Sequence, residues 1–128
     1  MTRIGKTLKR LKNEKRSALV LFLTAGDPSV KQTVDLVRAA FDAGADIVEI
    51  GVPFSDPVAD GPVIQESYLR AIDKGTNVKD AMEIARKVRT THPDSPIVFM
   101  LTCNLVLTYG VKKFMKDSAE CGVDGLIL

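Results

Sequence analysis

Apolar runs of strand length alternate along this chain with stretches of helical periodicity, and that alternation limits its fold more than any other feature. The run ALVLFLT, residues 18–24, is apolar at odd and even positions alike, which is typical of a parallel strand covered on both faces. Between such runs, apolar residues recur every three or four positions, as they do in amphipathic helices. Strands joined by helical crossovers must run parallel. The chain is therefore predicted to be α/β.

The expected elements follow from these patterns and from residues that begin or end helices. The predicted strands are residues 18–24, 46–50, 96–101 and 125–128. The predicted helices between them are residues 30–41, 62–74, 78–88 and 111–121. Asp27 and Pro28 suit the cap and the first position of the first of these helices. Gly44 is expected to end that helix.

A weak internal repeat links the two halves of the chain. AGAD, ending at Asp46, matches CGVD, ending at Asp124, and the two aspartates are 78 residues apart. Two β-α units per repeat occur in α/β barrels and in doubly wound sheets alike. The first β-α turn, TAGDP, lacks the G-x-G-x-x-G pattern, which disfavours a dinucleotide fold.

Charge is concentrated at the N-terminus. Residues 1–16 contain seven Lys or Arg against one acid, Glu14, with Ile4, Leu8 and Leu11 at helical spacing. A basic arm for nucleic acid or lipid is one interpretation. An ordinary surface helix with a narrow apolar stripe is the favoured one.

The composition is typical of a soluble globular protein, and it argues against several classes of partner. The net charge of +2 is too small to indicate binding to nucleic acid or to a membrane. No segment approaches the ~18 consecutive apolar residues of a membrane span. Cys103 and Cys121 have no metal or redox spacing, so reduced thiols in the cytoplasm are expected, with no metal site.

Two acids lie where an α/β barrel would place its chemistry, at the C-terminal ends of strands. Glu49 interrupts a buried strand, and a carboxyl group shielded from water there suits proton transfer. The alternative is a glutamate paired with a nearby cation or hydroxyl. Asp60 closes the following loop, and the alternative for this residue is a place at the start of a helix.

The loop at residues 51–62 is stiff and has unexplained apolar groups. It contains three prolines and two glycines, which restrict its backbone. Phe54 and Val58 have no periodic apolar partner. A stiffened loop with such groups at the end of a strand is typical of a binding surface, although a simple change of chain direction would also explain it.

This loop, GVPFSDPVADGP, resembles the signature of the tryptophan synthase α subunit family. Phe22 to Pro28 resembles the first β-α turn of that family, and Ala43 to Glu49 its second strand. Asn104 with Tyr109-Gly110, and GVDG at residues 122–125, are similar to the third and fourth units. The resemblance covers essentially the whole chain and implies a TIM barrel, (β/α)8, in which the basic first helix lies across the floor.

The resemblance also implies a reaction, the cleavage of indole-3-glycerol phosphate to indole and glyceraldehyde 3-phosphate without a cofactor in this subunit. Glu49 matches the general acid/base, and Asp60 the acid that faces the indole N–H. A partner β subunit, which carries PLP, would contact the loop in an α2β2 complex. The residues matched to substrate binding are Phe22, Ile64, Met100, Thr102 and Ile127. Those matched to partner binding are Pro53, Phe54, Asp56 and Pro57.

Two departures from the family pattern stand out. Thr102 occupies a position where a tyrosine is usual, which alters a wall of the pocket. A complete barrel needs about 250 residues, and the loops after its strands seven and eight form the phosphate-binding site. We therefore expect residues 1–128 to be one unit, the N-terminal half of a barrel, with a basic helix at 1–16. The chain alone is then expected to be inactive.

Three hypotheses remain open at this point. The first is a lyase, the α subunit or its N-terminal half. The second is a catalytically incompetent half-barrel that binds the β subunit or homodimerises, because its outer strands would present apolar edges. The third is another phosphate-handling α/β barrel, which the loop motif disfavours.

Overall fold

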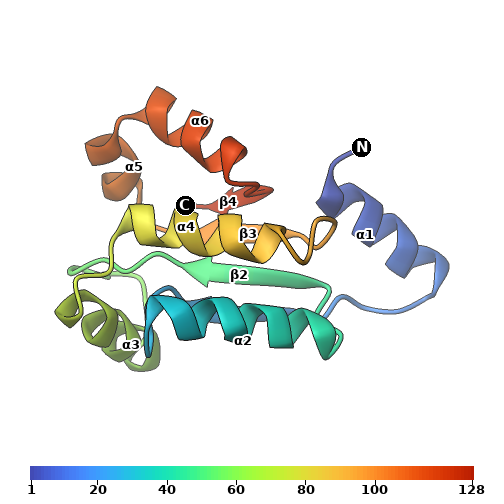
Figure 1. Cartoon of the computed structure of the whole chain (residues 1–128), viewed down its shortest axis with the longest axis horizontal. Helices are drawn as coiled ribbons and strands as arrows, with labels where there is room; N and C mark the ends of the chain where they lie inside the picture. The colour runs from blue at the N-terminus through green and yellow to red at the C-terminus, as the bar shows by residue number, and fades with distance from the viewer.

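The computed structural model describes residues 1–128 as one parallel sheet with six helices (Figure 1). The sheet order is β1-β2-β3-β4, and every neighbouring pair is parallel. The strands are β1 (Val20–Thr24), β2 (Ile47–Gly51), β3 (Ile97–Met100) and β4 (Gly125–Ile127). The helices are α1 (Arg3–Asn13), α2 (Val30–Asp42), α3 (Pro62–Asp73), α4 (Val78–Arg89), α5 (Cys103–Tyr109) and α6 (Val111–Glu120).

The strand order decides between the two α/β architectures. In a doubly wound sheet the order reverses between its two halves, and helices then cover both faces. Here each strand pairs with the next one along the chain, and α2 and α4 lie over the same face (Figure 1). This is the winding of a barrel wall, so the α/β prediction is confirmed and the barrel alternative is the correct one.

The main core lies between the sheet and these outer helices. Val48 and Ile50 of β2 point outward and are fully buried, as are Ile97 and Phe99 of β3. The helical side of this core is made by Val34, Val37 and Phe41 of α2, Ala81, Ile84, Ala85 and Val88 of α4, and Phe114 of α6. Burial of these side chains supplies the main favourable term in folding.

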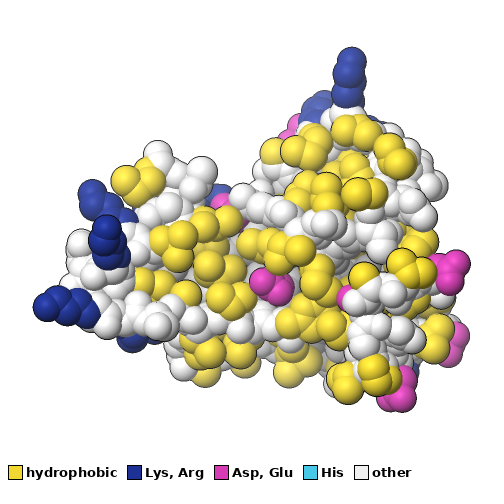
Figure 2. All heavy atoms as spheres, turned by 180° about the vertical axis from the view of Figure 1, so that it is seen from behind, with side chains coloured by type: hydrophobic (Ala, Val, Ile, Leu, Met, Phe, Trp, Pro, Cys, Tyr) yellow, Lys and Arg dark blue, Asp and Glu magenta, His cyan; other side chains and the backbone are white.

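The opposite face of the sheet carries no helix. Strand register aligns Phe22, Glu49, Val98 and Gly125 in one row across this inner face. The next row, toward the C-terminal ends of the strands, is Thr24, Gly51, Met100 and Ile127. Figure 2 shows the molecule from behind, with broad hydrophobic surface on the side away from α2 and α4. At the edges of this face Val20 and Ile127 are each 42% exposed.

The two repeated aspartates anchor α1 beneath the sheet. Asp46 accepts hydrogen bonds from Arg16 at 2.8 Å and from Arg10 at 3.0 Å. Its carboxylate also accepts the backbone N–H of Leu19, just before β1, at 2.9 Å. The Arg16 guanidinium is the main reason why the pKa of Asp46 lies far below its ordinary value of 3.8, and the Leu19 amide acts in the same direction.

Asp124 repeats this arrangement at the other strand pair. Its carboxylate accepts hydrogen bonds from Arg3 of α1 at 2.9 Å and from Arg89 of α4 at 3.1 Å. It also accepts the backbone N–H of Ile97, at the start of β3, at 2.9 Å. The basic N-terminal segment is thus a helix tied to the floor of the sheet, as the favoured interpretation predicts.

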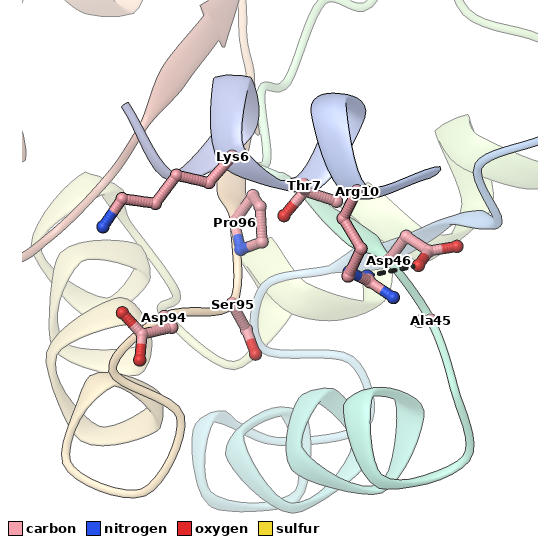
Figure 3. A pocket seen from close by; sticks show the side chains of 8 residues that line it. All are labelled: Lys6, Thr7, Arg10, Ala45, Asp46, Asp94, Ser95 and Pro96. Carbon is pink, nitrogen blue, oxygen red and sulfur yellow. Dashed lines mark hydrogen bonds and ion pairs between the residues drawn. The ribbon is translucent and has the colours of Figure 1, made fainter. Parts of the chain in front are cut away.

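A cavity of about 460 Å³ lies at this floor, between α1 and the starts of β2 and β3 (Figure 3). Figure 3 shows Arg10 turned onto Asp46, whereas Lys6 and Asp94 extend without an ion pair between them. The other lining residues are Thr7, Ala45, Ser95 and Pro96. The cavity opens at the end of the sheet opposite the predicted site.

Two local predictions are wrong. The first strand is not covered on both faces, because Leu19, Val20 and Leu21 are exposed at the sheet edge. Helix α2 is capped by Ser29, whose hydroxyl accepts the N–H of Gln32, rather than by Asp27. Asp27 instead accepts Arg70 of α3 at 2.8 Å.

Two further differences concern helices. In α1 the exposed Leu8 lies beside the stripe, and Thr7 takes the buried position with Leu11. Helix α5, Cys103–Tyr109, was not expected from the sequence. It is only 7 residues long, too short for periodicity to reveal, and Gly110 at φ 95° separates it from α6.

Candidate active site

An apolar cavity of about 230 Å³ lies at the C-terminal ends of β2, β3 and β4. The loop between β2 and α3 forms one wall, and the residues that follow β3 and β4 form the others. The lining residues are Val52, Ala59, Asp60, Tyr68, Met100, Leu101, Thr102, Ile127 and Leu128. Four predicted site residues are therefore brought together here, namely Asp60, Met100, Thr102 and Ile127.

Asp60 lines the cavity and does not cap a helix. The cap of α3 is Gly61, which makes no side-chain cap hydrogen bond, and Pro62 occupies the first turn. The Asp60 side chain makes no hydrogen bond to the protein. Its backbone carbonyl accepts the Gln65 amide at 2.6 Å, which holds the end of the loop against α3. The helix-start alternative for this carboxylate is therefore wrong.

Glu49 lies on the inner face of the sheet, in the register row directly below Gly51, Met100 and Ile127. Its neighbours across the sheet are Phe22 on β1 and Val98 on β3, both apolar. The carboxylate makes no hydrogen bond and no ion pair with the protein. The alternative of a glutamate held by a cation or hydroxyl is therefore not what the structure has.

Phe22 and Tyr68 meet over Gly51. A Cβ atom added to Gly51 would overlap the far edge of the Phe22 ring and lie 2.9 Å from the Tyr68 hydroxyl. Only glycine leaves room for both rings at this position. The two aromatic side chains thus close the β1 side of the inner face above Glu49.

A buried hydroxyl pair ties the first turn of α3 to β1. Ser67 donates to the backbone carbonyl of Ile64 at 2.8 Å, so the 2.7 Å contact between Thr24 and Ser67 is donated by Thr24. Ile64 is half-buried and does not line the cavity. Its backbone carbonyl is the acceptor at the end of this pair of hydrogen bonds.

Two polar groups of the cavity lack protein partners. The Oγ1 atom of Thr102 is buried without a hydrogen bond. The Tyr68 side chain is 2% exposed, and its hydroxyl makes no hydrogen bond. Burial, together with the nearby negative charge of Asp60, raises the pKa of Tyr68 well above its ordinary value of 10.0.

Sequence reasoning missed Tyr68 as a site residue. The sequence places it only within the predicted helix at residues 62–74. The one signal available was its hydroxyl, because a buried tyrosine normally needs a polar partner.

The predicted partner-binding loop is largely open to solvent. Pro53 is buried, Phe54 and Pro57 are half-buried, and Asp56 is exposed. Val58 beside them is 93% exposed. The loop therefore presents apolar and acidic groups on the rim of the cavity.

No group of three or more His, Cys, Asp or Glu residues is placed to hold a metal ion. None of the helices has the length and apolar character needed to cross a bilayer.

Comparison with known proteins identifies the family to which this arrangement belongs. Residues 8–128 match the family model described as tryptophan synthase alpha chain. The tryptophan synthase alpha chain of Thermoanaerobacter sp. strain X514 is 48% identical over 128 residues, covering 100% of this chain and 48% of that protein. That of Methylibium petroleiphilum is 44% identical over the same 128 residues.

Solved structures agree with the sequence comparison. The alpha subunit of tryptophan synthase from Legionella pneumophila superposes with a TM-score of 0.98 at 40% identity, covering all of this chain and 49% of that one. An M. tuberculosis tryptophan synthase gives a TM-score of 0.92 at 34% identity. The chain spans about half the length of the relatives it matches. It folds as the first four β/α units of a TIM barrel and belongs to the tryptophan synthase alpha chain family.

Proposed function

We propose that this chain supplies the acid/base groups for the cleavage of indole-3-glycerol phosphate to indole and glyceraldehyde 3-phosphate. The observation that carries the proposal is the placement of two carboxylates without protein partners. Glu49 lies on the inner face of the sheet, and Asp60 lines the apolar cavity one register row above it. The cavity is formed by residues that suit an aromatic ring, with polar groups at few positions.

The proposed chemistry needs only proton transfers. Glu49 gives a proton to the ring carbon that bears the glycerol side chain, which places positive charge on the ring nitrogen. Asp60 stabilises that charge through the ring N–H. Glu49 removes the proton of the side-chain hydroxyl next to the ring, the carbon–carbon bond breaks, and its electron pair returns to the ring. Indole and an aldehyde are the products, and one proton lost balances one gained.

The walls proposed for the substrate come from four elements. Phe22 closes the β1 side, and Ile64 lies in the first turn of α3. Met100 and Ile127 are the last residues of β3 and β4, and Thr102 follows β3. The aliphatic walls would exclude water from the ring, which strengthens both carboxylate interactions. Residues 1–128 are proposed to act as one unit, the N-terminal half of the barrel.

We further propose that the loop containing Pro53, Phe54, Asp56 and Pro57 binds a β subunit. Its exposed Asp56 and Val58 support this, because a rim with apolar and charged groups is typical of protein interfaces. PLP would belong to that partner, and this chain would need no cofactor for its own step. The proposed place of action is the cytoplasm, in the biosynthesis of tryptophan.

The test is indole release from indole-3-glycerol phosphate by the protein that contains this chain. Glu49→Gln keeps the shape of the side chain and removes its proton transfer, so turnover should fall by ~10² to 10⁴. Glu120→Gln, on the exposed surface of α6, is the matched control and should leave turnover unchanged. Near-normal turnover of the Glu49→Gln variant would refute the assignment.

Self-association of a half-barrel is the second candidate function. The outer strands β1 and β4 have no neighbours on one side, and Leu19, Val20 and Ile127 are exposed there. Two copies related by a twofold axis could pair these strands and cover the inner faces. Sedimentation of the 128-residue chain should then give a dimer, whereas a stable monomer at micromolar concentration would exclude this candidate.

A further inference from the structure

The cavity at the C-terminal ends of the strands contains few polar side chains. Of its nine lining residues, only Asp60, Tyr68 and Thr102 carry polar groups in their side chains. Asp60 accepts hydrogen bonds, whereas the two hydroxyl groups can also donate them. The cavity therefore has two hydroxyl groups that could donate a hydrogen bond to the Asp60 carboxylate, those of Tyr68 and Thr102.

Tyr68 is buried and lines the cavity. Its side chain is 2% exposed, and the hydroxyl would be 2.9 Å from a Cβ atom at position 51, so the phenol end lies over Gly51. The hydroxyl has no protein partner there. By contrast, the other tyrosine of the chain, Tyr109, donates its hydroxyl to Asp117 at 2.6 Å.

The protonation of Tyr68 suits a donor. Burial is the larger cause of its raised pKa, and the negative charge of Asp60 adds to the effect. The phenol therefore keeps its proton throughout the physiological range, and it shares the cavity with a carboxylate that makes no hydrogen bond with the protein. A charge-assisted hydrogen bond between a hydroxyl and a carboxylate is short and directional.

We propose that Tyr68 is a positioning residue whose hydroxyl donates to one oxygen of Asp60 when a ring is bound, and so aims the other oxygen at the ring N–H. Tyr68 would thereby set the preference of the cavity for aromatic rings that carry an N–H group. This inference rests on the proposed function, because it takes an indole ring as the occupant. It adds a residue that the resemblance does not assign.

The test compares two ligands, indole and 1-methylindole, which differ in the N–H. The chain contains no tryptophan, so the fluorescence of either ligand can be followed without a protein background. The wild type should bind indole more tightly. Tyr68→Phe should lower indole affinity roughly three- to tenfold, the worth of one hydrogen bond, and leave 1-methylindole within about twofold. Tyr109→Phe is the matched control and should change neither affinity.

Companion variants separate the possible failures. Asp60→Asn should lower the preference for indole further than Tyr68→Phe does. If Asp60→Asn keeps the full preference, or if neither ligand binds, the proposed function of the cavity is overturned. If Asp60→Asn loses the preference while Tyr68→Phe keeps it, only the role of Tyr68 is overturned. If Thr102→Val loses the preference for indole and Tyr68→Phe keeps it, Thr102 is the hydroxyl that donates to Asp60, and the proposal is refuted.

A measurement on the wild-type side chain guards against misfolding of the variants. With ¹³C at the phenol carbon of tyrosine, the chain gives two signals, and Tyr109→Phe identifies the one from Tyr68. Indole should shift the Tyr68 signal and 1-methylindole should shift it less. Equal shifts with the two ligands, or an equal loss of both affinities in Tyr68→Phe, would show that Tyr68 is only a wall of the cavity.

Discussion

Replacing Asp46 tests how much its hydrogen bonds and ion pairs stabilise the packing of α1 against the sheet. Asp46→Ala removes the acceptor of the Leu19 amide, and an amide left without its acceptor costs about 1–3 kcal/mol. It also removes the ion pairs with Arg10 and Arg16, whose side chains are about half exposed, so each contributes at most about 1 kcal/mol. The free energy of unfolding should therefore fall by about 1–5 kcal/mol in total.

Asp46→Asn divides this loss into its two parts. The amide oxygen of Asn still accepts the Leu19 N–H, so this variant should lose only the two ion pairs, which together contribute at most about 2 kcal/mol. Urea unfolding followed by circular dichroism at pH 7, at several protein concentrations, measures the difference. Asp35→Ala, on the exposed side of α2, is the control and should stay within about 0.5 kcal/mol of the wild type. Equal losses in the Ala and Asn variants would refute the role of the amide hydrogen bond.

The same carboxylate predicts how stability depends on pH. Arg16 holds the pKa of Asp46 below its ordinary value of 3.8, so the folded state binds this proton less readily than the unfolded chain. The stability contributed by Asp46 is then complete above the unfolded value and is lost as the pH falls below it. The wild type should lose stability from about pH 5 towards pH 2, and Asp46→Asn should lose less over that window. Parallel pH profiles of the two proteins would contradict this reasoning.

The remaining predictions concern the site. Gly51→Ala should lower the free energy of unfolding, measured in urea, by about 1–3 kcal/mol, because the new methyl group meets Phe22 and Tyr68. Gly61→Ala is the control, because a Cβ atom there would have nothing within 4 Å. An equal loss in the control would refute the clash with the two rings as the cause. Asp60→Asn should lower indole release and leave the melting temperature unchanged, because its carboxylate makes no hydrogen bond in the fold. A variant that melts earlier with full activity would contradict this.

Much of the fold could be predicted because its signals are local. The buried strands around Val48 and Phe99, the opening of α3 at Pro62 and the cap of α4 at Asn77 all have the residue types that these positions require. The exposure of Leu21 could not be predicted, because composition does not say whether a strand lies at the edge of a sheet. Pairing and edge position depend on residues far away in the chain.

The site was predicted unevenly for the same reason. The positions of Asp60 and Met100 follow from strand ends, which the sequence marks. Tyr68 reaches the cavity from a helix, and only the close approach over Gly51 reveals that its hydroxyl is there. A contact between a helix and a strand tip has no periodic signal, so its contribution emerges only in three dimensions.

The repeated aspartates occupy equivalent places in two strand pairs of the sheet. Asp46 precedes β2 and holds the start of β1, whereas Asp124 precedes β4 and holds the start of β3. Each aspartate therefore joins the two strands of one pair, and neither aspartate makes a hydrogen bond between β2 and β3. A segment of the chain that contains one such pair therefore contains both the aspartate and the backbone amide that it binds, so this hydrogen bond does not depend on the other strand pair.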